Sequence, residues 1–193
     1  NIVSSQLTVA LFAQRAIVVE GTTEASVLHG ICDREAQGAL EASGVSIVPV
    51  GGKTSIPLVH AILTSVGIPA YALFDADAGF EDRAKAHGKS QNKIDEERRK
   101  HARENRSILR YFGLAEEDFP ACNAHDEVAI FDDHLETFMQ ENWPEWGIAC
   151  ANLQAESGIS LAKNQLAYRT ATLKAECPAP EMLLKVLQKA KGH

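Results

Sequence analysis

Two short apolar runs in this 193-residue chain each end in a pair of acidic residues. Glu20 and Glu24 follow Ala-Ile-Val-Val, and Asp75 and Asp77 follow Tyr-Ala-Leu-Phe. A buried strand has this pattern when its carboxyl end opens onto a site. Carboxylates gathered at one sheet edge repel one another unless a cation lies between them, and hard ions such as Mg²⁺ prefer oxygen ligands. The pattern therefore predicts a metal site and phosphoryl chemistry.

Each of these acids also has a simpler interpretation. Glu24 would stabilise the first turn of a helix through the helix dipole, with Glu20 as a solvated strand end. Asp75 and Asp77 would bind backbone amides in a turn. Side chains two residues apart in an extended chain point to opposite faces, so both aspartates reach one site only if the chain turns there. The apolar run before them favours the metal site.

A glycine pair after a second apolar run is a weaker signal. Gly51-Gly52-Lys53 resembles the end of a P-loop, but that motif requires glycine where Ile47 stands. A turn that approaches a phosphate closely stays open as an interpretation. A plain strand-to-helix connection is the favoured one.

Later acids and one lysine are further candidates. Asp133 and Glu136 open a predicted helix, where acidic residues suit the helix dipole; the functional alternative makes them additional metal ligands. Lys163 is a surface charge unless the fold brings it beside the acids. The seven histidines show no His-x-x-x-His pattern, so a zinc site has little support.

Alternating strands and helices must position these residues. Apolar runs predict strands at residues 16–20, 45–50, 69–74 and 128–131. Helices are predicted at residues 22–42, 55–66, 135–141, 160–175 and 180–190. Such β-α-β units imply an α/β fold with a mainly parallel sheet flanked by helices. Sites in these sheets lie outside the carboxyl ends of the strands, where Glu20, Gly51 and Asp75 fall.

One segment interrupts this alternation. Residues 81–111 are strongly charged, with few apolar residues before Ile108. We predict an inserted helical hairpin, broken near Gly88 and separate from the core. The expected domains are a catalytic domain, residues 1–79 and 121–193, and a helical insertion, residues 80–120.

The composition is that of a globular cytoplasmic protein. The four cysteines are far apart and form no Cys-x-x-Cys pair, which argues against a zinc ribbon or a redox motif. No apolar run reaches about 18 residues and no signal peptide is present, so no membrane is expected as a partner. The missing initiator Met predicts a fragment of a longer protein. The net charge of −7 argues against a DNA-coating protein but not against a nucleic-acid enzyme that uses cations.

In their order along the chain, these motifs resemble a Toprim domain, the metal-binding fold of topoisomerases, DnaG-type primases and several nucleases. The shared pattern is a glutamate after the first strand and Asp-x-Asp after a later one. The chain is most similar to the C-terminal region of the overcoming lysogenization defect (OLD) family nucleases. The similarity rests on Val19-Glu20-Gly21-x-x-Glu24, Val50-Gly51-Gly52-Lys53, Asp75-x-Asp77, Leu135-Glu136 and Lys163.

Three features differ from these families. His134 precedes Leu135, which leaves the ligand set near Glu136 open. None of the three tyrosines has the context of a strand-cleaving residue, so a topoisomerase is disfavoured. The ATPase domain usual in OLD proteins is absent, which agrees with a fragment.

The resemblance implies a DNA endonuclease that uses two divalent cations, Mg²⁺ or Mn²⁺, with Ca²⁺ binding but not supporting turnover. Lys163 would add a positive charge for the phosphate or the leaving group. The expected partners are DNA and an N-terminal ATPase domain in the full-length protein, and a homodimer through the missing region stays open. The expected metal ligands are Glu20, Glu24, Asp75, Asp77, Asp133 and Glu136.

Two other functions remain as alternatives. In a haloacid-dehalogenase-like phosphatase, Asp75 would be the nucleophile and Asp77 the acid/base, although that family expects Thr or Val where Gly79 stands. A Toprim module that binds nucleic acid without cutting it is the second alternative. The absence of Mg²⁺ or Mn²⁺ binding would favour this module.

Overall fold

The computed structural model describes residues 2–158 and 164–192, and this part of the chain contains one five-stranded sheet. The strand order is β2-β1-β3-β5-β4, with β4 antiparallel to β5 and all other pairs parallel. The strands are β1 (Arg15–Val19), β2 (Val45–Pro49), β3 (Ala70–Asp75), β4 (Asn123–Ala124) and β5 (Val128–Phe131). The prediction of an α/β fold with a mainly parallel sheet is confirmed.

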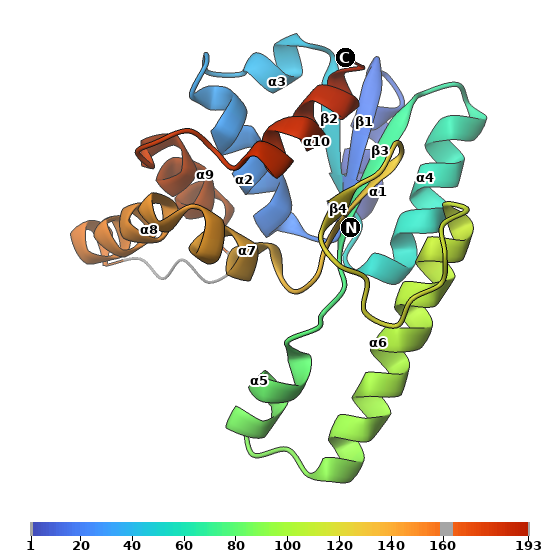
Figure 1. Ribbon diagram of the computed structural model, residues 1–193. Helices are drawn as coiled ribbons and strands as arrows, with labels where there is room; N and C mark the ends of the chain where they lie inside the picture. Colours follow the sequence, from blue (N-terminus) through green and yellow to red (C-terminus); the bar gives the residue numbers. More distant parts are fainter. Residues whose placement is uncertain (1, 159–163, 193) are drawn as a thin grey trace.

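Helices cover both faces of this sheet, as Figure 1 shows, and they form two separate apolar cores. One face is covered by α1 (Ile2–Ala10), α4 (Ile56–Ser65) and the end of α6 (Gln91–Tyr111). The other is covered by α2 (Thr22–Asp33), α3 (Ala39–Ala42), α7 (Leu135–Asn142), α8 (Pro144–Ser157), α9 (Gln165–Lys174) and α10 (Glu181–Lys191). Because both faces are covered, β1, β3 and β5 read as continuous apolar runs.

The strand register brings the carboxyl ends of the central strands to one edge. Val19 of β1 lies opposite Leu73 of β3, and Asp75 of β3 lies opposite Phe131 of β5. The residues directly after β1, β3 and β5 therefore share this edge. The edge is the expected place for a site in a parallel sheet.

Several elements differ from the sequence predictions. The helix predicted over residues 22–42 is two helices: α2 ends at Asp33, and Gly38, with a φ of 76°, is the N-cap of α3. Helix α8, which the sequence did not predict, begins at Pro144; proline is tolerated in a first turn, where no backbone donor is needed. Strand β4 has two residues, too few for a periodic signal. Part of the helix predicted over residues 160–175 lies outside the described residues.

The predicted helical hairpin is present as α5 (Phe80–Ala86) and α6, with Gly88 between them at a φ of 69°. The pair extends away from the sheet (Figure 1) and has a small apolar core of Phe80, Ala84 and Ile94, against which Phe119 packs. Ile108 and Leu109, near the end of α6, belong instead to the main core. Helix α6 therefore joins the hairpin rigidly to the sheet. The domain boundaries at residues 80 and 120 stay a prediction.

No helix in the described part of the chain is both long and apolar enough to cross a membrane.

Gly30 allows α2 and α9 to approach closely, and a substitution at this contact tests the packing of the two helices. A Cβ at Gly30 would lie 2.6 Å from Thr172 Cβ and 2.7 Å from the Arg169 carbonyl oxygen. We expect Gly30→Ala to lower the free energy of unfolding by about 1–3 kcal/mol, because the helices must separate. Gly147→Ala in α8 is the control: its Cβ meets no described atom within 4 Å, so stability should stay equal or rise by up to about 1 kcal/mol. Equal stability of both variants by urea denaturation would contradict this packing.

Candidate metal-binding site

Four of the predicted ligands come from elements that meet at the carboxyl edge of the sheet. Glu20 directly follows β1, and Asp75 is the last residue of β3. Glu24 and Glu136 lie in the first turns of α2 and α7. The glutamates are thus carried to the edge by the strand and helix starts that surround Asp75.

Hydrogen bonds fix the two acids at the strand ends. Glu20 Oε1 accepts a hydrogen bond from the backbone N–H of Asp75 at 3.0 Å. Asp75 Oδ2 accepts one from the Leu135 N–H at 3.3 Å, which ties β3 to the start of α7. The other oxygen, Asp75 Oδ1, is buried and has no hydrogen-bond partner among the described residues. A buried polar atom of this kind is costly unless a ligand supplies the missing partner.

Glu24 also folds back toward this edge. Its Oε2 accepts a hydrogen bond from the Gly21 N–H at 3.1 Å, and Gly21 is the N-cap of α2. Glu24 is buried, with a relative exposure of 7%. A helix-capping role and a ligand role are compatible here, because the Gly21 N–H binds one of the two carboxylate oxygens.

Burial and neighbouring like charges disfavour the ionised forms of Glu20, Glu24 and Asp75. Burial raises the pKa of Asp75 well above its ordinary value, and the charges of Glu24, Glu20 and Glu136 raise it further. Burial also raises the pKa of Glu20 to about 7 and raises that of Glu24. Like charges in a poorly solvated site favour the protonated form. A divalent cation would remove the need for these protons.

Asp77 differs from these four acids in that basic residues bind its carboxylate. Its backbone has a φ of 60°, a left-handed conformation that is uncommon for a residue with a side chain. Its carboxylate lies 2.6 Å from Lys53 Nζ and 3.1 Å from His134 Nε2. His101 Nδ1 is also 3.1 Å away, as an ion-pair contact without the alignment of a hydrogen bond. Burial alone would raise the pKa of Asp77, but these three partners outweigh it and hold the pKa well below its usual range.

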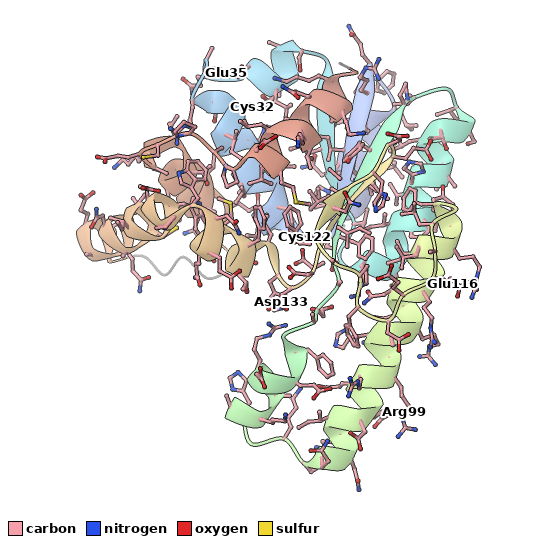
Figure 2. All side chains as sticks on the ribbon, viewed as in Figure 1. Cys32, Glu35, Arg99, Glu116, Cys122 and Asp133 are labelled. Carbon is pink, nitrogen blue, oxygen red and sulfur yellow. The ribbon has the colours of Figure 1, made fainter. Side chains whose placement is uncertain are left out.

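Asp133 is likewise occupied by a basic residue. Arg83 of α5 donates to Asp133 Oδ2 at 2.5 Å, and the Gly79 N–H donates to Oδ1 at 3.1 Å. Burial raises the pKa of Asp133, but the Arg83 contact outweighs it and the pKa is lowered. Asp133 lies where the sheet edge meets the α5–α6 pair (Figure 2). Asp133 lies one residue before His134, the N-cap of α7.

Lys53 is the functional candidate that the sequence interpretation missed. Its side chain is only 5% exposed, and its Nζ donates to three oxygens: the Asp75 carbonyl at 2.8 Å, Asp77 Oδ2 at 2.6 Å and Asn105 Oδ1 at 2.9 Å. Asn105 in turn donates to the Ala76 carbonyl at 2.8 Å. Lys53 thus holds the turn after β3 in place. The sequence signal that could have identified Lys53 is its position directly after a glycine pair at the carboxyl edge of the sheet.

The predicted residues therefore fall into three groups. Glu20, Glu24, Asp75 and Glu136 interact electrostatically around the unpartnered Asp75 oxygen, whereas Asp77 and Asp133 are already neutralised by basic residues. Lys163 lies outside the described residues. Within residues 2–158 and 164–192, no three acidic, His or Cys side chains are close enough together to form a finished metal site. The donor chemistry nevertheless fits a hard cation, since every candidate ligand is a carboxylate and Asp75 has a free buried oxygen.

An acidic carboxyl edge on a mainly parallel, helix-flanked sheet is the arrangement of a Toprim domain. Residues 11–77, which include Glu20, Glu24, Asp75 and Asp77, match the family model described as "Overcoming lysogenization defect protein-like, TOPRIM domain". The predicted resemblance to the Toprim region of OLD proteins is confirmed.

Solved structures share the fold over nearly the whole chain. The C-terminal region of the Burkholderia pseudomallei OLD protein is 14% identical, with a TM-score of 0.54, and the match covers 93% of this chain and 98% of that chain. The C-terminal region of the Xanthomonas campestris pv. campestris OLD protein is also 14% identical, with a TM-score of 0.57 and coverages of 93% and 95%. No curated protein matches the chain. At these identities the structural matches establish the fold.

The raised pKa of Glu20 predicts a loss of stability with rising pH in chelator-treated protein. The folded state holds the proton more tightly than an unfolded glutamate of pKa 4.5, so this stabilisation is complete below pH 4.5 and is lost as the pH rises through about 7. Glu20→Gln retains the acceptor for the Asp75 N–H and does not ionise. Between about pH 5 and about pH 8, the free energy of unfolding of this variant should therefore fall by up to about 3 kcal/mol less than that of the wild type, as measured by urea denaturation. Parallel profiles for variant and wild type would contradict the burial of this acid.

The Lys53 contacts predict a large effect of removing its charge. Lys53→Met leaves Asp77 without its closest cation and Asn105 without a donor, so we expect a loss of about 3–5 kcal/mol in the free energy of unfolding. Lys185→Met is the control, because Lys185 is 55% exposed and pairs with Glu181 on the surface of α10. Its effect should stay below about 0.5 kcal/mol. Similar losses for both variants in urea denaturation would refute the structural role of Lys53.

Proposed function

We propose that this chain is the catalytic Toprim domain of a metal-dependent DNA endonuclease of the OLD type, part of a protein that also carries an N-terminal ATPase domain. The observation that carries the proposal is Asp75: it is buried at the end of β3, one of its oxygens has no partner among the described residues, and three other carboxylates raise its pKa. Such a site is unfavourable for folding alone. It is favourable if divalent cations bind there.

Glu20, Glu24, Asp75 and Glu136 are the proposed first ligands. Bound Mg²⁺ or Mn²⁺ would supply an activated water and stabilise charge on the scissile phosphate. The backbone N–H groups of Asp75 and Leu135 hold Glu20 and Asp75 in position before any ion arrives. This preorganisation reduces the motion needed for binding.

Asp77 and Asp133 have a different part in this proposal. Each is bound by basic residues, so each would join a second metal position only after Lys53 or Arg83 releases it. In their present contacts they orient the turn after β3 and the start of α7 around the first ligands. Lys163 remains a proposed phosphate contact.

The geometry does not favour the phosphatase alternative. That reaction needs Asp77 as a proton donor, but contacts with His101, His134 and Lys53 overcome its burial and hold its pKa well below the usual range. An acid that stays ionised is a poor general acid. The second alternative, a Toprim module that binds nucleic acid without cutting it, would not bind a divalent cation at Asp75. It therefore differs from our proposal in a property that can be measured.

The proposal predicts that Asp75→Asn abolishes Mn²⁺-dependent cleavage of supercoiled DNA. Losing a partner that only orients a ligand costs about 10- to 100-fold in metal affinity or activity, so losing the central ligand should cost at least that much. Cleavage rates on agarose gels and Mn²⁺ affinity by calorimetry should fall together.

Asp126→Asn is the matched control for this experiment. Asp126 is 99% exposed and precedes β5, at the other end of the strand from the acids. Its variant should cleave like the wild type. Undiminished cleavage by Asp75→Asn, or an equal loss in both variants, would remove Asp75 from the site.

A further inference from the structure

Helices α5 and α6 concentrate the positive charge of this chain. Residues 80–111 contain ten of its 19 Lys and Arg residues but only six of its 26 Asp and Glu residues. The segment is therefore basic within a chain of net charge −7. Such an asymmetry gives a local positive potential that attracts polyanions.

A hollow of about 340 Å³ lies between this helical pair and the candidate metal site. Two acids also line it, and both are already bound: Asp77 by Lys53, and Glu97 by two hydrogen bonds from Lys89 at 2.7 and 3.0 Å. Since Asp77 and His134 belong to its wall, the hollow opens beside the acids of β3 and α7. Its basic lining comes from Arg83, His87, Lys89, Lys100, His101 and His134.

Some of the arginines on α6 have carboxylate partners. Arg98 lies 3.0 Å from Glu81, Arg106 lies 3.3 Å from Asp118, and Arg110 lies 2.7 Å from Glu116. All three arginines are exposed. Their charges are largely balanced by these neighbours.

Three other cations of the same helix have no ion pair within the described parts of the chain: Lys93, Arg99 and Arg103. They are exposed and line a depression on α6 together with Lys100 and two acids, Glu96 and the Lys89-bound Glu97. Lys100 also lines the hollow, so the two basic surfaces are continuous. Figure 2 shows Arg99 on the part of α6 that extends away from the sheet. These three cations lie along α6, which leads to the acidic site, and they have no ion-pair partners in the part of the chain that the structure describes. They are therefore suited to binding successive phosphates of a nucleic-acid strand.

We infer that α5 and α6 form a phosphate-binding arm. The hollow at its base binds one backbone phosphate of a DNA strand, and Lys93, Arg99 and Arg103 bind the phosphates that follow. The choice of DNA as the polyanion rests on the proposed function. The arm holds the strand beside Asp75, where the acidic edge alone would repel it. Lysine and arginine contacts to phosphates release counterions, so affinity through the arm falls with added salt.

The test compares DNA binding by two triple variants of the full chain. The first, Lys93→Ala/Arg99→Ala/Arg103→Ala, removes the unpaired cations. Fluorescence anisotropy with a short labelled duplex, in EDTA and at several salt concentrations, measures binding without cleavage. We expect affinity to fall at least about tenfold and the salt dependence to weaken by about two to three ions.

The second variant, Arg98→Ala/Arg106→Ala/Arg110→Ala, removes the same charge from the same helix but takes the paired arginines. It should bind within about twofold of the wild type. Arg99→Lys/Arg103→Lys retains the positive charges and should also retain affinity, which separates loss of charge from loss of folding. Equal losses of DNA affinity in both triple variants, or wild-type affinity in the first, would contradict the proposed phosphate-binding arm.

Hydrolysis of bis(p-nitrophenyl) phosphate by the unaltered chain with Mn²⁺ judges the proposed function separately, because this small diester does not need the arm. Hydrolysis together with equal DNA affinities in the triple variants would refute the arm and keep the nuclease. Absence of hydrolysis with the expected difference between the triple variants would keep the arm and refute the nuclease.

Discussion

Mutual repulsion among buried carboxylates is the constraint on which this structure depends. Glu20, Glu24 and Asp75 are buried or half-buried at one sheet edge, and Glu136 adds its charge from α7. Unit charges about 4 Å apart repel by about 4 kcal/mol even at an effective dielectric constant of about 20. Burial is the largest cause of the raised pKa values of Glu20 and Asp75, and this repulsion adds to it. The fold maintains the arrangement because backbone N–H groups of β3 and α7 hold the acids in place.

The two aspartates of the Asp-x-Asp motif have separate tasks because of one backbone angle. The left-handed conformation of Asp77 turns its carboxylate toward Lys53, while Asp75 keeps the direction of β3. Lys53 in turn reaches Asn105 of α6, and Arg83 of α5 reaches Asp133. The helical pair is thus linked to the site through a hydrogen bond and an ion pair as well as through its packing. A basic arm and an acidic centre are held in a fixed relation.

The elements with strong periodicity could be predicted from the sequence, and the site only in part. The strands before Glu20 and Asp75, and the hairpin around Gly88, follow from apolar runs and from a glycine with positive φ. The burial of Lys53 could not be predicted, because it depends on Asn105, 52 residues away. The separation of Asp77 from Asp75 depends on the same contacts. Local patterns report which strand ends carry acids, whereas the partner of each acid is set by tertiary packing.

The central claim is that the buried acids around Asp75 hold a divalent cation. Crystals of this chain soaked in Mn²⁺ and measured for anomalous scattering test it most directly. The account predicts a manganese peak within bonding distance of Asp75 Oδ1, with oxygens of Glu20, Glu24 or Glu136 among its other ligands. A fully soaked crystal with no peak at Asp75, or with manganese only at surface histidines, would contradict it.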